Sequence, residues 1–235
     1  MLKLENVSSG YGYLQVLWDV SFEVKKATIV AILGLNGAGK TTTLKTIAGI
    51  IRPTGGKVYF DGKDITGART NELVKQGLVF IPEERNLFSG MNVYENLLMG
   101  AYTVRDRAEV RKTLRYVYSL FPRLEERRKQ LVGTMSGGER QMVAVARGLM
   151  SSPKLVMLDE PSMGLSPQNV VIVFETIQKL RDEGVTVIIV EQNVKTTLKI
   201  ADYAYIMDHG CIVLDGPSER LAADDKVQKM YMGLS

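Results

Sequence analysis

The segment from Gly34 to Thr42 carries residue types and a spacing that could bind phosphate. It fits the pattern G-x-x-x-x-G-K-[ST]; an apolar run at residues 29–33 comes directly before it, and residues 42–49 are typical of a helix. Glycines permit the positive φ angles that turn successive N–H groups inward, and the start of a helix favours anions. We therefore predict a phosphate-binding loop, or P-loop, made of Gly34, Leu35, Asn36, Gly37, Ala38, Gly39, Lys40, Thr41 and Thr42.

Two adjacent acids, Asp159 and Glu160, end a second apolar run at residues 155–158. A buried strand with acids at its carboxyl end places them in the ligand crevice of an open α/β sheet. Next to a P-loop, these acids predict hydrolysis of a nucleoside triphosphate. Lys40 would neutralise the outer phosphates, while Thr41 and, through water, Asp159 would hold Mg²⁺. Glu160 would orient or deprotonate the attacking water.

Ser136, Gly137, Gly138 and Glu139 open a further helix, because apolar residues recur at helical spacing from Met142 onward. Ser136 and Glu139 form a capping box, which explains two of the four residues without any ligand. It does not explain the two glycines, which each cost a helix roughly 1 kcal/mol. We interpret the glycine pair as a place where a phosphate approaches the backbone.

The elements around these residues predict an α/β protein. Alternating residues at 2–7 and 20–24 indicate antiparallel strands, and Tyr11 lies between them, flanked by glycines, where it could stack on a base. Continuous apolar runs such as 78–81 and 185–190 indicate buried parallel strands. The order of the pieces is therefore an antiparallel β region, a P-loop core and further parallel strands.

Helical spacing of apolar residues replaces alternation from Glu83 to about Gly133, which indicates a helical insertion. After the acids, we expect a helix over 168–183, a hairpin over 204–214 and a short helical tail over 218–235.

Composition limits the classes of protein to which the chain can belong. It is 45% hydrophobic and 24% charged, as in folded globular proteins, and no apolar run approaches the ~18 residues of a membrane span. The first residues lack a secretory signal, so we expect a soluble, cytosolic protein. Cys211 is the single cysteine, which excludes intrachain disulfides and cysteine-based metal clusters.

The charge balance argues against nucleic acid as a partner. A net charge of +4 is small for a chain of 235 residues. One basic cluster is interleaved with acids and is interpreted as a solvated face: Arg123, Arg127, Arg128 and Lys129 with Glu125 and Glu126.

Four motifs in this order resemble the nucleotide-binding subunit of ABC transporters: the P-loop, Ser136 to Glu139, Asp159-Glu160 and Glu191-Gln192-Asn193. Shorter segments are similar to the LivF-type ATPase of branched-chain amino acid importers: Ile81-Pro82-Glu83, Phe121-Pro122-Arg123-Leu124 with Glu126-Arg127-Arg128, Gly133 to Glu139, and Val190 to Asn193. The resemblance implies ATP and Mg²⁺ as cofactors. It also implies one domain over 1–235, with a RecA-like core and β subdomain in 1–82 and 151–235 and a helical subdomain in 83–150.

The resemblance also assigns roles to individual residues. Tyr11 would stack on adenine, and Glu83 stands where most family members have a glutamine that senses Mg²⁺ and the γ-phosphate. Gln192 replaces the usual switch histidine, and Ser166 replaces a common aspartate. An anionic Glu83 beside triphosphate is tolerable mainly if Mg²⁺ lies between them.

Because the amide of Gln192 cannot titrate, we predict that the pH–rate profile of ATP hydrolysis has no limb from a histidine near pH 6.5. The measurement is kcat against pH for the parent and a variant lacking His209, the single histidine of the chain. A limb that disappears with His209 would contradict the prediction.

The resemblance implies that the chain works with partners. Ser136, Gly137 and Gly138 of one subunit would complete the ATP site at the P-loop of another, which is a second copy or a LivG-like chain. Membrane permeases would carry the solute, and a periplasmic or extracellular solute-binding protein would act indirectly. The chain would lie peripherally on the cytoplasmic face of the membrane.

A permease helix could dock in a groove lined by Leu87, Phe88, Met91 and Val93, although the same side chains would serve equally well as ordinary core.

Other functions stay open at this point. An ABC ATPase for urea or short amides would look alike, and Gln192 argues against a lipopolysaccharide-type exporter. Soluble ABC ATPases that act on nucleic acid or ribosomes typically have two fused cassettes or long coiled insertions, and this sequence has neither. A simple phosphotransferase would leave Ser136 to Glu139 unexplained.

Overall fold

The structure is a computed structural model and describes residues 1–225 and 227–228. Its first sheet is antiparallel, with strand order β2-β1-β4-β5. The strands are β1 (Leu2–Tyr11), β2 (Leu14–Val24), β4 (Gly55–Phe60) and β5 (Lys63–Asp64). This sheet confirms the expected antiparallel β region, and only Gly12 and Tyr13 separate its first two strands.

The second sheet has the order β10-β9-β3-β8-β7-β6 and is parallel except at its edge strand β10. Its strands are β3 (Ile29–Leu33), β6 (Leu78–Ile81), β7 (Leu155–Asp159), β8 (Thr186–Glu191), β9 (Tyr203–Asp208) and β10 (Cys211–Pro217). The P-loop follows β3, the acids end β7, and β8 lies between them. The carboxyl ends of these strands meet at one edge, where α/β sheets bind ligands.

Helices connect and cover the strands. They are α1 (Lys40–Ile47), α2 (Thr70–Gln76), α3 (Val93–Gly100), α4 (Arg107–Leu120), α5 (Pro122–Glu126), α6 (Gly137–Leu149), α7 (Pro167–Asp182), α8 (Val194–Thr197) and α9 (Ser218–Ala222), with a short 3₁₀ helix η1 (Val132–Thr134). Helix α9 begins the tail expected over 218–235, and residues 226 and 229–235 of that prediction lie outside the described residues.

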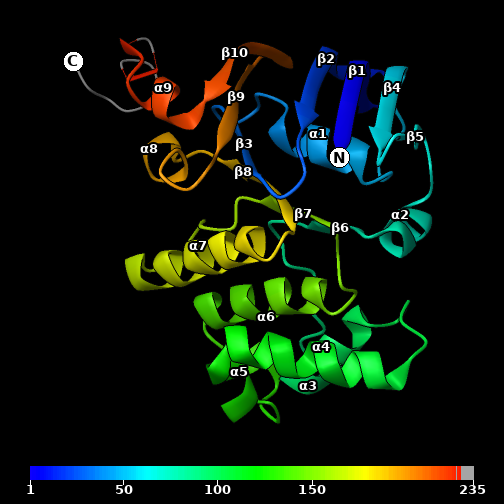
Figure 1. The fold of residues 1–235 in the computed structure, drawn as a ribbon, viewed down its shortest axis with the longest axis vertical. Helices are drawn as coiled ribbons and strands as arrows, with labels where there is room; N and C mark the ends of the chain where they lie inside the picture. Colours follow the sequence, from blue (N-terminus) through cyan, green and yellow to red (C-terminus); the bar gives the residue numbers. More distant parts are fainter. Residues whose placement is uncertain (226, 229–235) are drawn as a thin grey trace.

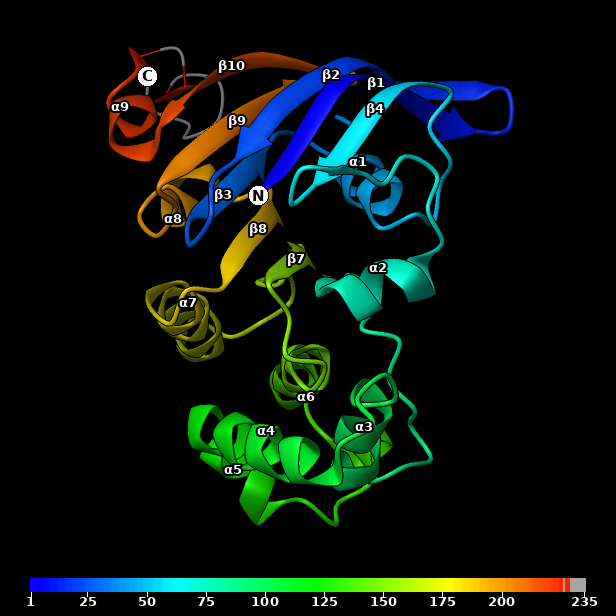
Figure 2. The same ribbon diagram turned by 45° about the vertical axis from the view of Figure 1, so that its right-hand side comes forward.

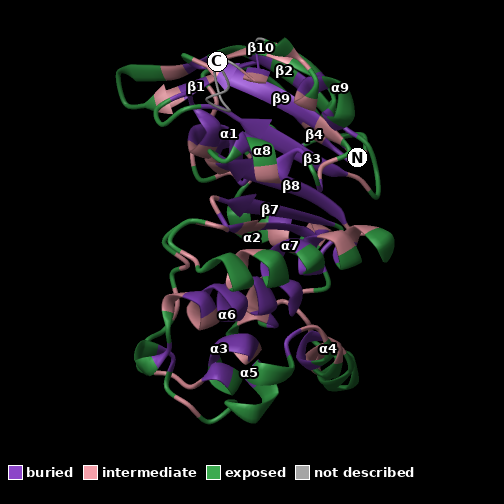
Figure 3. Cartoon of the chain, turned by 90° about the vertical axis from the view of Figure 1, so that its left-hand side faces the viewer, coloured by how far each residue is buried: buried purple, intermediate pink, exposed green. Residues whose placement is uncertain are grey.

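The second sheet is covered on both faces, because side chains alternate along each strand. Ile32 and Met157 face α1 and the antiparallel sheet. Leu33 and Leu158 face α6 and α7. Figure 1 shows α1 beside the antiparallel sheet and α6 and α7 on the other side of β6 and β7. Burial on both faces explains the continuous apolar runs of these strands (Figure 3).

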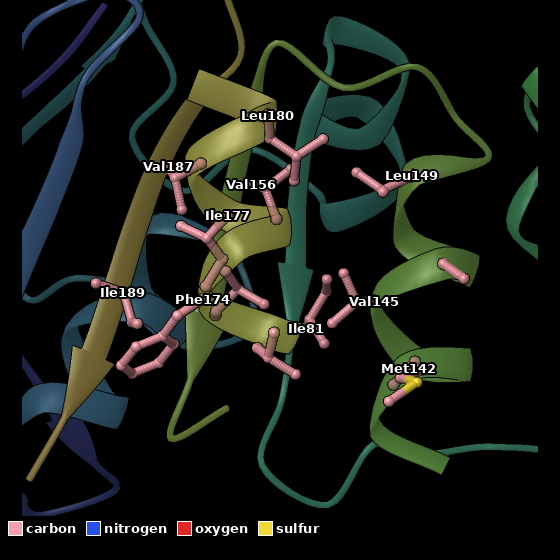
Figure 4. Packing of buried hydrophobic residues seen from close by; sticks show 14 of the residues in the cluster. Ile81, Met142, Val145, Leu149, Val156, Phe174, Ile177, Leu180, Val187 and Ile189 are labelled. Atoms are coloured by element: carbon pink, nitrogen blue, oxygen red, sulfur yellow. The ribbon is translucent and has the colours of Figure 1, made fainter. Parts of the chain in front are cut away.

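The packing of α7 and α6 is visible at close range. Phe174, Ile177 and Leu180 of α7 point toward Val187 and Ile189 of β8 (Figure 4). On the far side of β6, the apolar side chains of α6 point toward the same core (Figure 4). This cluster holds α6 and α7 against the second sheet.

Helix α6 also joins the sheet to the inserted helices. It packs against β6 and against α3, α4 and α5, which lie at the end of the molecule away from the antiparallel sheet (Figure 2). The expected helical insertion is therefore confirmed. In the part of the chain that the structure describes, no helix combines the length and the apolar character needed to cross a membrane.

Candidate nucleotide-binding site

The P-loop links β3 to α1, and its backbone is held in the shape that phosphate binding requires. Gly39 is the N-cap of α1 with a φ of 103°, a left-handed conformation that favours glycine. Gly34 lies so close to β9 that a Cβ there would be 2.3 Å from the carbonyl oxygen of Met207. No side chain caps α1, so the N–H groups of its first turn can bind an anion.

Lys40 connects the P-loop to the acids of β7. Its buried Nζ donates to the carbonyl oxygens of Gly34 at 3.0 Å and Leu35 at 3.3 Å. The same atom lies 3.2 Å from Glu160 Oε1 in an ion pair. A phosphate in the loop would compete with the carboxylate for this ammonium, so nucleotide binding and the orientation of Glu160 are coupled.

Thr41 and Asp159 place two oxygen ligands next to each other. Thr41 Oγ1 donates to Asp159 Oδ1 at 3.0 Å, and Asp159 is only 2% exposed. Burial raises the pKa of Asp159 to about 6; the charges of Glu160 and Glu83 also raise it, and the Thr41 hydrogen bond opposes them. A divalent cation beside this carboxylate would favour its ionised form.

The side chains of Thr41 and Asp159 fit a Mg²⁺ ion that enters the site together with the nucleotide. Among the described residues, no group of three or more His, Cys, Asp or Glu side chains could hold a metal ion. The described residues therefore do not form a site in which protein side chains alone would surround a metal ion. Thr41 and Asp159 suit Mg²⁺, which usually takes one or two protein ligands and completes its shell with phosphate oxygens and water.

Other predicted residues lie around the same loop. Tyr11 ends β1 with its side chain 48% exposed, and its hydroxyl accepts a hydrogen bond from Thr42 Oγ1 at 3.5 Å. Glu83 is exposed, and its charge raises the pKa of Asp159. Gln192 has an exposed side chain, and its backbone N–H donates to Glu160 Oε2 at 3.2 Å. The fold thus collects residues 11, 83 and 192 around the P-loop.

The turn with His209 also reaches the P-loop, because the N–H of Gly210 donates to the carbonyl oxygen of Ala38 at 2.9 Å. The imidazole itself points away from the chain. Its side chain is 93% exposed and its Nδ1 lies 2.8 Å from Asp208 Oδ1. The prediction about the pH–rate profile remains a prediction.

Ser136 and Glu139 form the expected capping box of α6. Ser136 Oγ accepts from the N–H of Glu139 at 3.3 Å, and Glu139 Oε2 accepts from the N–H of Ser136 at 2.9 Å. Arg127 Nη1 lies 2.9 Å from Glu139 Oε1. The hydrogen bond from Ser136 and the charge of Arg127 lower the pKa of Glu139. Arg127 stays 45% exposed in this ion pair, as expected for a residue of a solvated face.

The two glycines after Ser136 have different surroundings. A Cβ on Gly138 would lie 2.0 Å from Asn169 Nδ2, so a side chain there would require Asn169 of α7 to move. A Cβ on Gly137 would have nothing within 4 Å, and the adjacent Ser136 is exposed. The interpretation of the glycine pair as a place where a phosphate approaches the backbone remains a prediction.

The P-loop and the start of α6 belong to different parts of the chain. Helix α1 packs on one face of the second sheet, with β1 and β2, and α6 packs on the other, with α3 and β6 (Figures 1 and 2). Each of the two motifs has exposed residues on its own side of the sheet: Leu35, Asn36 and Gly37 in the P-loop, and Ser136 at the start of α6.

A large groove lies between the second sheet and the helical part. Its volume is about 800 Å³. Of the four residues expected to line a groove, Phe88 does so and is 44% exposed. Leu87 and Met91 do not line it, and Val93 is fully buried in the core. The groove prediction was therefore right for Phe88 and wrong for the other three residues. Other lining residues come from α1, α2, β6, α3 and α6 and from the segments that follow α1 and α3. They include Ile50, Val74, Phe80, Met99, Tyr102 and Arg147.

Sequence reasoning missed Asn169, and it placed Glu191 in a motif at the end of a strand without giving that acid a role. Asn169 fills the space above Gly138, and Glu191 is a buried acid on β8 that binds the backbone of Ser162. A signal for Glu191 was present, because a charged residue directly follows an otherwise apolar strand. Asn169 gave no signal, since its partner lies 31 positions earlier in the sequence.

Comparisons with known proteins agree with this geometry. Residues 17–163 match the family described as "ABC transporter". The chain is 45% identical, over 99% of its length and 100% of the relative, to the high-affinity branched-chain amino acid transport ATP-binding protein BraG of Pseudomonas aeruginosa. It is 39% identical, over 100% and 99%, to the probable branched-chain amino acid transport ATP-binding protein LivF of Archaeoglobus fulgidus. Identity to the lipopolysaccharide export protein LptB of Escherichia coli K12 is lower, 34% over 99% and 97%.

Solved structures show the same fold. An ATP-binding cassette of an ABC transporter in its ADP conformation superposes with a TM-score of 0.86 at 29% identity, covering 100% of this chain and 99% of the other. A dimeric bacterial ABC transporter cassette gives 0.83 at 25% identity, covering 93% and 99%. With a matching family model, relatives over its full length and a P-loop facing the acids of β7, the chain belongs to the ABC transporter family, as one of its ATP-binding subunits.

Proposed function

We propose that the chain hydrolyses ATP to energise the import of branched-chain amino acids through separate membrane permeases. One observation carries the ATPase assignment: Lys40 contacts Glu160, and Thr41 contacts Asp159, at an α1 N-terminus that no side chain caps. The solute rests on likeness to BraG and LivF, because ATPase subunits do not touch what is transported. Urea or short amides are the alternative solutes.

Catalysis would be mostly positioning and charge neutralisation. The N–H groups of the α1 start and the ammonium of Lys40 bind the phosphate oxygens, and Tyr11 offers its ring to the adenine. Mg²⁺, held by Thr41 and Asp159, would supply charge neutralisation at the phosphates. Glu160, released from Lys40 when phosphate enters, orients or deprotonates the attacking water, with Gln192 beside it.

The site would be completed by a second ATP-binding subunit. Ser136 and Gly137 are accessible at the start of α6, away from α1 of their own chain. The partner is a second copy or a LivG-like chain. The γ-phosphate favours association of the two subunits, because only in the closed pair do both subunits contact it.

We propose one domain over residues 1–235, in which 1–82 and 151–235 form the nucleotide-binding core with its β subdomain and 83–150 form the helical subdomain. The groove of about 800 Å³ lies between these two parts and would receive a cytoplasmic helix of a permease. The chain would then lie peripherally on the cytoplasmic face of the membrane, with a periplasmic or extracellular solute-binding protein acting indirectly. No feature favours nucleic acid.

Replacing Phe88 by serine tests the groove. Phe88 is half-exposed and the guanidinium of Arg147 lies 5.8 Å from its ring centre, so the change removes apolar groove surface with little loss of core. We expect ATP hydrolysis by the isolated chain to stay within about two-fold of the parent, and solute uptake in cells to fall about ten-fold or more. Tyr94→Ser is the matched control, because Tyr94 is similarly exposed on α3 but does not line the groove. Full uptake with Phe88→Ser would remove the groove from the proposal.

Two measurements test the proposed function as a whole. The purified chain should hydrolyse ATP only with Mg²⁺. Cells that lack this gene but keep the permeases should regain uptake of radiolabelled leucine, and not of urea, when it is restored. ATP hydrolysis with urea uptake restored instead would reject the solute and keep the ATPase.

A further inference from the structure

Glu191 is a buried carboxyl group that the mechanism above does not use. It ends β8 and is 1% exposed. Residues alternate along β8, so Glu191 lies on the same face of the sheet as Ile189 and Val187, which pack against α7. A strand position that could have been filled by another apolar residue is occupied by an acid, at the edge where the acids of β7 also lie.

Three hydrogen bonds connect the end of β8 to the segment that carries Glu160. The N–H of Glu160 donates to the carbonyl oxygen of Val190 at 2.9 Å. The N–H of Gln192 donates to Glu160 Oε2 at 3.2 Å. Glu191 Oε1 accepts from the N–H of Ser162 at 2.9 Å. Glu160 has a φ of 46°, uncommon for a non-glycine residue, so these bonds hold a backbone conformation that would otherwise relax.

The charges around Glu191 favour its neutral form. Among the ion pairs of the described residues, none includes Glu191, and the ammonium of Lys40 is paired with the neighbouring Glu160. The neighbouring α7 presents apolar Val173 and Phe174 to this face, and β3 presents Leu33. Burial raises the pKa of Glu191 to about 7; hydrogen bonds from Ser162 oppose this, and the charge of Glu160 and a hydrogen bond with it raise the pKa further.

We infer that Glu191 is a positioning residue for Glu160: as a neutral acid it accepts from the N–H of Ser162 and donates its own proton in a hydrogen bond to the Glu160 carboxylate. Glu160 then stays ionised and keeps a fixed direction after Lys40 has turned to the phosphates. This role rests on the proposed function, in which Glu160 acts on the attacking water.

The sign of the pH dependence follows from the raised pKa. Below pH 7 Glu191 is neutral and donates; as pH rises through about 7 it ionises, the hydrogen bond is lost and two adjacent carboxylates repel. Turnover should therefore fall above neutral pH. Stability follows the same direction, because the unfolded chain releases this proton nearer pH 4.5: the contribution is full below that value and is lost as pH rises through about 7.

The test compares Glu191→Gln with Glu191→Ala. Glutamine has nearly the same shape, accepts from Ser162 through its oxygen and donates to Glu160 through its NH₂ group at every pH. We expect Glu191→Gln to keep kcat within about two-fold of the parent near pH 7, to remove the decline above neutral pH and to raise Tm at pH 8 more than at pH 5. Glu191→Ala should lower kcat about 10–100-fold with KM nearly unchanged, the loss expected for a hydrogen bond to a charged group.

A structural control lies on the same strand. Thr186 is buried, and its Oγ1 accepts from the N–H of Ala27, so Thr186→Val should lower Tm without changing the pH profile of kcat. Equal losses in Glu191→Gln and Glu191→Ala, with the pH profile retained, would overturn the inference while leaving Glu160 in its role. If Glu191→Ala does not fold, Glu191→Gln and its pH profile still decide. Unchanged turnover in Glu160→Gln would instead reject the proposed function itself.

Discussion

Replacing Glu160 by glutamine should lower kcat for ATP hydrolysis about 10²–10⁴-fold, the range that general acid–base catalysis contributes. The amide keeps the shape of the side chain but cannot take a proton from water. Affinity for ATP should be retained or increased, because the change removes an anion that lies 3.2 Å from Lys40 Nζ and competes with phosphate for it. With the γ-phosphate intact, pairs of subunits should accumulate on a sizing column in Mg-ATP.

The matched control is Glu219→Gln, an exposed carboxylate on α9 far along the chain from the site. It should leave turnover, ATP affinity and subunit association unchanged. Turnover near the parent value in Glu160→Gln would show that another group handles the water. Loss of ATP binding together with turnover would show that Glu160 maintains the P-loop instead of acting on water.

Mixing two inactive variants should restore ATP hydrolysis. Lys40→Ala removes the ammonium that binds phosphate, and Gly137→Asp places a negative charge at the accessible start of α6. Both should be inactive alone. If the site is shared between chains, a mixed pair has one intact site, formed by the P-loop of the Gly137→Asp chain and the α6 start of the Lys40→Ala chain. A 1:1 mixture should then recover at most about one quarter of the parent activity, because about half of the pairs are mixed and each has one of two sites.

The structure makes Gly137→Asp a specific change. A side chain at Gly137 meets nothing within 4 Å, and an aspartate in the first turn of α6 is favoured by the helix dipole, so Tm should not fall. Mixing Lys40→Ala with a chain that carries both changes is the control, since no pair then contains an intact site. An inactive mixture of the two single variants, with mixed pairs demonstrated by differential tags, would contradict a site shared between two copies of this chain.

Local patterns were sufficient for most of the fold. The apolar run at residues 78–81 coincides with β6, and the alternation near the N-terminus marks β1 and β2. The P-loop and Asp159-Glu160 were recognised because strand, turn and acid follow one another within a few residues. Phe88 was placed in a groove and lies in one, but Val93 was placed beside it and is buried. Apolar residue type alone cannot say which of two nearby residues faces a subdomain boundary and which faces the core.

The sequence by itself determined that the chain binds and hydrolyses a triphosphate, because the residues that do so are specified by type and by short spacing. Only the tertiary structure decided that Asn169 reaches Gly138 from α7 and that Ser162 contacts Glu191. It also placed α1 and α6 on opposite faces of one sheet. The physical reason is that backbone conformation and burial follow from local residue types, whereas contacts between residues about 30 positions apart depend on how whole elements pack.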